Sequence, residues 1–180
     1  MIIGLTGPSA AGKGTIVKYL VEKYHAKQIR FSDPLRDIIH RLYQHETREN
    51  MSHLATFLRG EFGGDILIST LLRDIEKLEA PIFVLDGMRH LDEYRVLSQR
   101  DDFTMWSVDA NIKTRFNRII QRGENLNETK LTLEQFEEQH KLKTEEHIPE
   151  LIEKAYEHLD NNGTVEELYA QVDALMEAQQ

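Results

Sequence analysis

The chain has 180 residues, 40% of them hydrophobic, which is enough for a single domain over 1–180 with a substantial core. Its 22 basic and 31 acidic side chains give a net charge of −9, which argues against a general nucleic-acid binder, because a phosphate backbone requires a basic surface. The lack of cysteine excludes a disulfide scaffold and a thiolate metal site, and no apolar run is long enough to span a membrane. We therefore expect a cytoplasmic protein that acts on small molecules, as a monomer or a small homo-oligomer, with neither a membrane nor a nucleic-acid polymer as partner.

The first predicted element is a buried strand over 1–5, which a glycine-rich turn follows at 7–15. A helix with an apolar face is predicted over 13–24. Strand, glycine-rich turn and helix form the context of a phosphate-binding loop, because the glycines let several backbone N–H groups converge on an anion and the helix start adds its positive dipole end. The ammonium group of Lys13 is then expected near the outer phosphates of ATP.

The loop departs from the common pattern G-x-x-x-x-G-K-[ST] directly after its lysine. Gly14 stands where a hydroxyl residue is usual, and the hydroxyl comes one place later, at Thr15. We therefore expect Thr15 to contact Mg²⁺ either directly or through a water molecule. The loop residues predicted to bind ATP are Gly7, Ala10, Ala11, Gly12, Lys13, Gly14 and Thr15.

The next segment begins with a short predicted strand over 27–31, and a helix starts at Ser32-Asp33-Pro34. Ser32 or Asp33 caps this helix, and Pro34 suits its first turn. Two more helices, separated by one break, are predicted within 51–79. Because Asp33 follows a strand, it is a helix cap, a general base for a hydroxyl acceptor or a ligand to metal-bound water.

The second half of the chain alternates strands and helices. Strands are predicted over 81–85, 103–108 and 156–159, helices over 90–99, 111–122, 132–145 and from 164 onward, and a polar loop over 123–131. Alternation of this kind predicts an α/β fold, in which a parallel sheet carries helices on both faces and ligands bind beyond the carboxyl ends of the strands.

Charged residues follow several of these strands. Asp86 ends one of them, where it either holds Mg²⁺ beside the phosphate loop or only forms an Asp-Gly turn. Arg115, Arg118 and Arg122 share one face of the helix after the next strand. Guanidinium groups bind phosphate bidentately and phosphoryl transfer needs such clamps, although each arginine taken alone also fits a solvated charged face. The other arginines with a suggestive placement are Arg36, Arg59 and Arg89.

Four short segments resemble the nucleoside monophosphate kinase family of phosphate-loop enzymes. Residues 12–15, Gly-Lys-Gly-Thr, resemble the adenylate-kinase form of the loop, and residues 33–36 resemble the Asp-x-Leu-Arg segment of that family. Residues 86–89 are similar to its Asp-Gly-x-x-Arg segment but one residue shorter, and residues 118–122 resemble the Arg-x-x-x-Arg element that leads into the lid.

This resemblance implies a three-layer α/β/α fold with a five-stranded parallel sheet in the order 2-3-1-4-5. It also implies a mobile acceptor-binding insertion at about 33–75 and a mobile lid at about 119–145. Together with the placements described above, it leads us to expect the following roles. The acceptor residues are Asp33, Arg36, Arg59 and Arg89, those with catalytic roles are Lys13, Asp33, Arg118 and Arg122, and those that arrange Mg²⁺ are Thr15 and Asp86.

Residues 159–168 look like the C-terminal segment of a second family, the dephospho-coenzyme A kinases. In both families the turn near Asn162 and Gly163 lies against the adenine of ATP, so these two residues complete the implied ATP site. A monophosphate acceptor is already ionised and needs no base, whereas a ribose hydroxyl needs one, for which Asp33 is the candidate.

We therefore expect ATP-dependent phosphoryl transfer, with Mg²⁺, to a small nucleotide, most simply a nucleoside or deoxynucleoside monophosphate. Phosphorylation of the 3′-hydroxyl of dephospho-coenzyme A is the alternative within the enzymes. An ATP-binding regulator that transfers nothing is the alternative outside them. The arginines after several strands favour an enzyme, because a regulator that only binds ATP needs no acceptor site.

Overall fold

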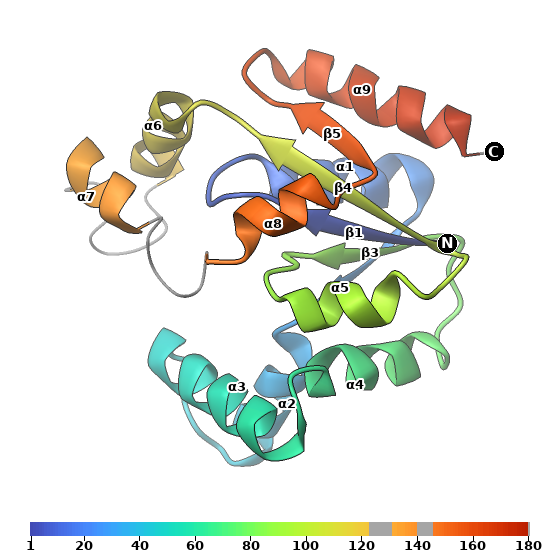
Figure 1. Cartoon of the computed structure of the whole chain (residues 1–180), viewed down its shortest axis with the longest axis vertical. Helices are drawn as coiled ribbons and strands as arrows, with labels where there is room; N and C mark the ends of the chain where they lie inside the picture. Colours follow the sequence, from blue (N-terminus) through green and yellow to red (C-terminus); the bar gives the residue numbers. More distant parts are fainter. Residues whose placement is uncertain (123–130, 140–145, 180) are drawn as a thin grey trace.

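The computed structural model describes residues 1–122, 131–139 and 146–179, apart from the side chains of Arg122 and Gln139. Within these ranges five parallel strands form one sheet in the order β2-β3-β1-β4-β5, as expected. The arrowheads of β1, β3, β4 and β5 in Figure 1 point toward the same side, and β2 runs parallel to β3, so the carboxyl ends of the strands share one edge. The strands are β1 (Ile2–Thr6), β2 (Lys27–Arg30), β3 (Phe83–Asp86), β4 (Phe103–Asp109) and β5 (Glu157–Asp160).

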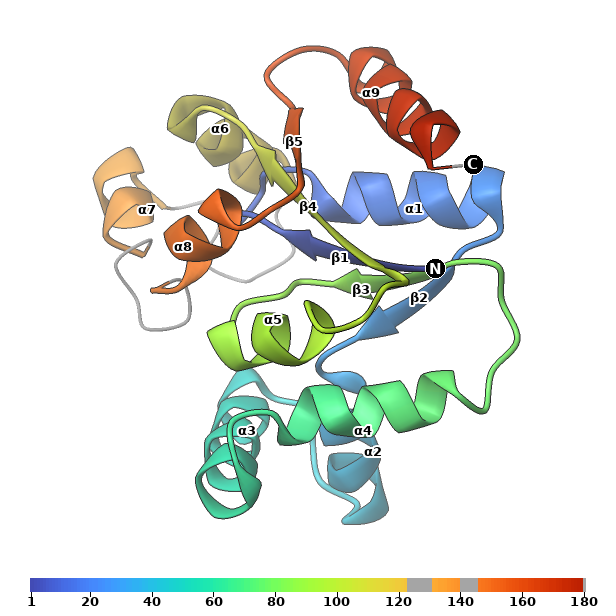
Figure 2. The same ribbon diagram turned by 45° about the vertical axis from the view of Figure 1, so that its right-hand side comes forward.

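Helices cover both faces of the sheet, which confirms the three-layer α/β/α fold (Figures 1 and 2). One face packs against α1 (Lys13–Tyr24) and α9 (Val165–Ala178). The other packs against α4 (Ile66–Ile75), α5 (Leu91–Leu97) and α8 (Ile148–Glu153). Each face has its own hydrophobic core, and the strands contribute to both because successive side chains point to opposite sides.

The central strands show this alternation directly. In β3, Val84 belongs to the core beneath α1 and α9, whereas Phe83 and Leu85 belong to the opposite core. In β4, Trp106 lies in the first core and Met105 in the second. The near-continuous apolar runs of these strands therefore reflect burial on both faces, as is usual for parallel sheets.

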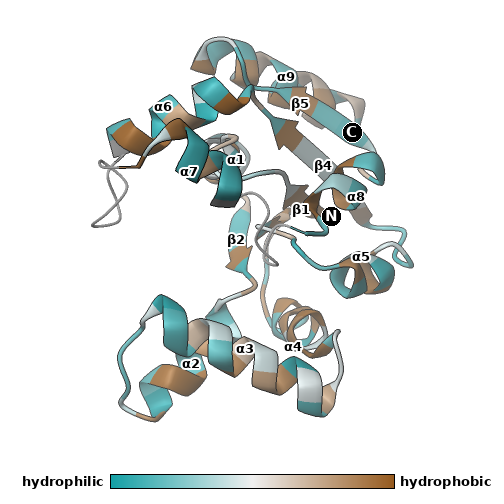
Figure 3. Ribbon diagram, turned by 60° about the vertical axis from the view of Figure 1, so that its left-hand side comes forward, coloured by the Kyte–Doolittle hydropathy of each residue, from teal (hydrophilic) through white to brown (hydrophobic). Residues whose placement is uncertain are grey.

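A separate group of helices lies beyond the β2 edge of the sheet (Figure 3). It consists of α2 (Asp33–Arg41), α3 (Arg48–Phe62) and the start of α4. These helices have a small core of their own, formed by Leu35, Ala55 and Leu67. The group coincides with the predicted acceptor-binding insertion, whose mobility stays a prediction. On the opposite side, α6 (Ile112–Arg122) and α7 (Leu133–Gln139) follow β4.

The prediction for 132–148 was incomplete. The structure has α7 where a longer helix to 145 was predicted, and residues 140–145 lie outside the described part of the chain, as do residues 123–130 of the predicted loop. The helix α8 was not predicted at all. It has only 6 residues, of which Ile148 and Leu151 are buried, and so short a segment shows no helical periodicity in the sequence.

A cluster of polar groups connects α1 and α9, the two helices that cover one face of the sheet. The hydroxyls of Tyr19 and Tyr24 donate to Oδ1 of Asp173 over 2.8 and 2.7 Å, and Nζ of Lys23 donates to Oδ2 over 2.8 Å. The rings of Tyr19 and Tyr169 stack with centroids 3.8 Å apart. This cluster fixes α9 against α1, the helix that follows the phosphate loop. Across the described residues, no helix is both long and apolar enough to pass through a membrane.

Candidate active site at the carboxyl edge of the sheet

The glycine-rich turn between β1 and α1 takes a conformation that few side chains tolerate. Gly7 and Gly12 have φ of 138° and 114°, and Ala10, which is not a glycine, has φ of 60°. Backbone strain of this kind concentrates at ligand-binding sites. The Nζ atom of Lys13 donates to the main-chain oxygens of Gly7 and Pro8 over 2.6 and 2.9 Å, so the ammonium group lies across the turn.

A cavity of about 630 Å³ opens above this turn. It is lined by Ser9, Ala10, Gly12, Lys13, Gly14, Thr15, Asp86, Arg89 and Arg118. Five of the seven loop residues predicted to bind ATP therefore line the cavity. Of the other two, Gly7 contributes a carbonyl to Lys13, and Ala11 is fully buried. The predicted Mg²⁺ residues, Thr15 and Asp86, face the same space.

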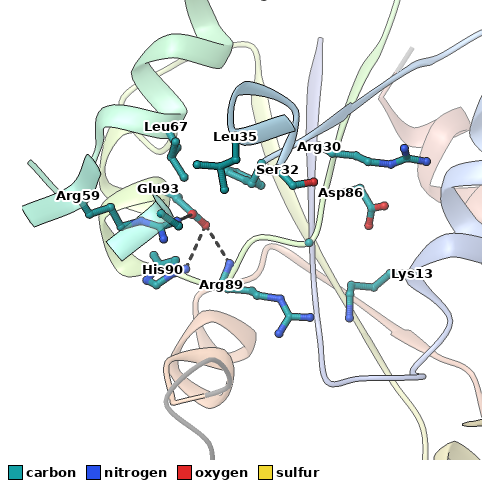
Figure 4. A pocket seen from close by; sticks show the side chains of 13 residues that line it. Lys13, Arg30, Ser32, Leu35, Arg59, Leu67, Asp86, Arg89, His90 and Glu93 are labelled. Atoms are coloured by element: carbon teal, nitrogen blue, oxygen red, sulfur yellow. Dashed lines mark hydrogen bonds and ion pairs between the residues drawn. The ribbon is translucent and has the colours of Figure 1, made fainter. Parts of the chain in front are cut away.

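A second cavity of about 350 Å³ lies between the sheet edge and the helices α2, α3 and α4 (Figure 4). Lys13, Asp86 and Arg89 line both cavities, so the two spaces meet at these three side chains. Nε2 of Gln28 donates to Oδ2 of Asp86 over 2.9 Å, which holds that carboxylate at the junction. The remaining residues of the second cavity are Arg30, Phe31, Ser32, Leu35, Ala55, Arg59, Leu67, Gly87, His90 and Glu93.

The far end of the second cavity carries a buried ion pair. Oε1 of Glu93 lies 3.2 Å from Nη2 of Arg59, and Oε2 accepts the main-chain N–H groups of Arg89 and His90 over 2.9 and 3.1 Å. Only 1% of Glu93 is exposed, and this burial raises the pKa of its carboxyl. The Nε atom of Arg59 is buried and has no hydrogen-bond partner among the described residues. An unsatisfied buried donor beside a cavity indicates a place for an acceptor atom of a ligand.

The wall opposite this ion pair is apolar. Phe31, Leu35, Ala55 and Leu67 form it, and the last three are also the core of the helices beyond β2. In Figure 4, Leu35 and Leu67 lie above the Arg59–Glu93 pair, while Lys13 and Arg89 lie toward the other end of the cavity. The cavity thus suits a ligand with an apolar body and anionic groups.

Two predicted acceptor residues do not line either cavity. Asp33 accepts the N–H of Arg30 over 2.8 Å, at the start of α2. Nη1 of Arg36 donates to Oγ of Ser32 over 2.6 Å and lies 3.5 Å from Oδ1 of Asp33, while its Nε atom pairs with Glu46. The structure therefore separates Asp33 and Arg36 from Arg59 and Arg89. Their predicted roles stay predictions without a contact to support them.

The turn near Asn162 and Gly163, which was predicted to lie against the adenine of ATP, does not line the cavity above the phosphate loop. Asn162 accepts the N–H of Asn111 over 2.7 Å through Oδ1. The preceding residue, Asn161, is instead buried and donates from Nδ2 to the main-chain oxygen of Ala11 over 2.7 Å. Arg118 lies beside it, and the side chain of Arg122 lies outside the described part of the chain.

Comparison with known families agrees with this geometry. Residues 6–127, which include the phosphate loop, Asp86, Arg89 and Arg118, match the family described as "AAA domain". The chain belongs to the AAA domain family. The chain is 26% identical over 178 residues to a "UPF0200 protein" of Methanoculleus marisnigri, a match that covers 97% of this chain and 94% of the relative.

A shorter part of the chain is similar in sequence to an enzyme. It is 34% identical over 116 residues to the adenylate kinase of Bartonella henselae, covering 63% of this chain and 58% of that protein. The shikimate kinase from Bacteroides thetaiotaomicron has a similar structure, with a TM-score of 0.65 at 16% identity over 99% of this chain and 98% of that one. These likenesses support a phosphate-loop kinase-like fold for this AAA domain, in agreement with the α/β prediction.

Sequence reasoning missed several residues that line the cavities of this AAA domain. Arg30 is not among the arginines that the sequence singled out, yet it is the last residue of β2 and therefore lies at the ligand edge. Glu93 follows His90 by three places, the spacing of a capping box, which the sequence displays. That spacing predicts a helix start, but it does not reveal that the carboxylate is buried beside Arg59.

His90 should contribute to the change of folding stability with pH. Burial, and then the charge of Arg59, lower the pKa of His90 from 6.5 to about 4. Between these pH values the unfolded chain binds a proton that the folded chain does not, so this histidine makes stability fall as the pH falls from 6.5 to 4. The raised pKa of Glu93 changes stability with pH in the opposite direction. Because the wild type and a His90 variant both contain Glu93, this contribution is common to them.

His90→Gln, which keeps a side-chain acceptor for the helix N–H, should therefore lose less stability than the wild type between pH 7 and pH 5. Urea midpoints measured at several pH values test this expectation. His53→Gln serves as the control, because His53 is exposed on α3. If the urea midpoints of the wild type and His90→Gln changed with pH in the same way, His90 would not be the source of this pH dependence.

Proposed function

We propose that this protein transfers the γ-phosphoryl group of ATP to a nucleoside or deoxynucleoside monophosphate. The observation that carries the proposal is the meeting of two cavities at Lys13, Asp86 and Arg89. A donor in one cavity and an acceptor in the other would react at that junction. Such transfer depends on positioning and electrostatic stabilisation more than on covalent help from the protein.

The donor side is the cavity above the glycine-rich turn. Its backbone amides and Lys13 would hold the β- and γ-phosphates, and Arg118 would neutralise charge on the transferred group. In the described part of the chain no group of three or more His, Cys, Asp or Glu could hold a metal ion by itself. Thr15 and Asp86 therefore suit Mg²⁺ that arrives with the nucleotide, since Mg²⁺ typically combines one or two protein ligands with phosphates and water. Mg²⁺ held there would neutralise negative charge on the phosphate groups.

The acceptor side is the cavity beneath α2, α3 and α4. Its apolar wall fits the base, and Arg30, Arg59 and Arg89 supply the positive charge that an anionic acceptor requires. An ionised phosphate oxygen of the acceptor attacks the γ-phosphorus, a new P–O bond forms, and the bond to the bridging oxygen of ADP breaks. No base is needed for this attack, and Asp33 does not line the cavity, so a monophosphate is favoured over a hydroxyl acceptor. The similarity to an adenylate kinase supports a nucleotide acceptor.

The direct test is an ATP-coupled screen of all ribonucleoside and deoxyribonucleoside monophosphates, with dephospho-coenzyme A and shikimate as hydroxyl acceptors. Turnover with one or a few monophosphates is the expected result. Turnover with a hydroxyl acceptor alone would replace the monophosphate proposal with the alternative class of kinase. Binding of ATP without turnover of any acceptor would favour a regulator.

Arg59→Lys should weaken the binding of the acceptor and leave the binding of ATP unchanged. Lysine keeps the charge beside Glu93 but has no equivalent of the buried Nε donor, and Arg59 lines the second cavity but not the cavity above the phosphate loop. Loss of one hydrogen bond from a charged donor should raise KM for the acceptor about tenfold or more. Steady-state kinetics with each substrate varied in turn measure this split. Arg48→Lys, an exposed change on the same helix, is the control, and an equal rise in both KM values would contradict the assignment.

A further inference from the structure

The two terminal nitrogens of the Arg118 guanidinium group differ in their hydrogen bonds. Nη2 donates to the main-chain oxygen of Asn161 over 2.8 Å and to its Oδ1 atom over 3.3 Å. Nη1 is buried, and no residue in the described ranges offers it a hydrogen bond. Arg118 also lines the cavity above the phosphate loop, and an unsatisfied buried donor beside a cavity indicates a place for an acceptor atom of a ligand.

Asn161 connects Arg118 to the phosphate loop. It directly follows β5, is only 5% exposed, and donates its main-chain N–H to the oxygen of Asp109 at the end of β4. Its side chain donates from Nδ2 to the oxygen of Ala11 over 2.7 Å. A Cβ on Gly12 would lie 2.0 Å from the same Nδ2 atom, so the loop packs directly against this amide. One side chain thus contacts both the loop and the arginine of α6.

The chemistry of these contacts requires an amide. The carbonyl of Ala11 needs a donor, and the guanidinium of Arg118 needs an acceptor, so the two ends of the Asn161 side chain are fully specified by their partners. A carboxylate would present an oxygen to the Ala11 carbonyl, and a hydroxyl would be too short to reach both groups. The guanidinium is planar and rigid, so fixing Nη2 also fixes the direction of Nη1.

We propose that Asn161 is a positioning residue for the phosphoryl transfer inferred above, on which this step rests. It aims Nη1 of Arg118 at the phosphate oxygens of ATP and holds the loop at Ala11 through the same amide. Because Asn161 contacts both Ala11 and Arg118, the position of the Arg118 guanidinium depends on the conformation of the phosphate loop. Asn161 itself does not touch the reacting atoms.

The test is a double-variant cycle with Asn161→Ala and Arg118→Ala, measured in kcat and in the affinity for ATP with Mg²⁺ by calorimetry. Removal of a supporting contact typically costs 10–100-fold, and Arg118 keeps its bond to the main-chain oxygen, so we expect Asn161→Ala to lower both quantities about tenfold. In the Arg118→Ala background the same change should cost roughly threefold or less. A merely structural role would give equal factors in both backgrounds.

The matched control is Asn117→Ala, an exposed asparagine one residue before Arg118 on α6, which should change neither quantity. If Asn161→Ala does not fold, as judged by thermal unfolding, Asn161→Ser takes its place in the cycle. Equal factors in the two backgrounds, or no loss at all, would overturn the role of Asn161 while leaving the kinase proposal intact. If the wild type turns over no acceptor, the proposed function fails, and the ATP affinities alone decide whether Asn161 acts through Arg118.

Discussion

Lys13→Met should reduce kcat by about 10²–10³-fold, the loss typical of removing one charge-stabilising donor from an active site. The ammonium group of Lys13 lies at the junction of the two cavities and across the glycine-rich turn. It is therefore the cation best placed to follow the phosphoryl group from donor to acceptor. Methionine keeps most of the side-chain volume, so the change removes charge more than packing.

Steady-state turnover with ATP and the acceptor found in the screen measures this effect, and thermal unfolding checks that the variant is folded. Lys18→Met provides the matched control, because Lys18 lies on the same helix with its side chain 72% exposed and only a 3.7 Å pair with Glu22. We expect Lys18→Met to retain wild-type kcat. A Lys13→Met enzyme within tenfold of the wild type would remove Lys13 from the reaction.

Gly7→Ala should destabilise the folded protein by about 1–3 kcal/mol through backbone strain alone. The φ of Gly7 is 138°, and a Cβ there would lie 2.1 Å from the main-chain oxygen of Val108. That oxygen belongs to β4, which pairs with β1 and β5 and cannot shift without disturbing both ladders. The conformation and the lack of space therefore act in the same direction.

Urea unfolding followed by circular dichroism gives the comparison. Gly60→Ala is the control, because Gly60 lies within α3 and a Cβ there meets no atom within 4 Å. Alanine is the better helix former, so Gly60→Ala should raise stability by roughly 0.5–1 kcal/mol. If Gly7→Ala shifted the urea midpoint upward as Gly60→Ala does, the strained loop conformation would be wrong.

Most strands and helices could be predicted from local signals, whereas the order of the strands came from the family resemblance. Strands such as β1 and β3 are apolar runs bounded by turn residues, and the starts of α2 and α9 carry a proline and a capping threonine. Each signal lies within a few residues of the element that it marks. The helix α8 lacked such a signal, because its burial comes from contacts with β1 and β4 rather than from a pattern of its own.

The site could be predicted only in part, for the same reason. The phosphate loop is contiguous in sequence, and the rule that ligands bind at strand ends located Asp86 and Arg89. Contacts between distant residues have no such rule. Arg59 and Glu93 are 34 residues apart, and Ala11 and Asn161 are 150 apart, so neither pair shows in the sequence. Arg36 was assigned to the acceptor by its resemblance to the Asp-x-Leu-Arg segment, and no local pattern reveals its pairing with Glu46.

The bond between Asn161 and Ala11 has a consequence for how the protein is made. The ribosome synthesises the glycine-rich turn before the amide that supports it, which emerges 150 residues later. Asp173, which anchors the helix behind the turn, comes later still. During translation the turn therefore lacks these supports until Asn161 and Asp173 have left the exit tunnel, so nascent chains should acquire their nucleotide site only after both residues have emerged.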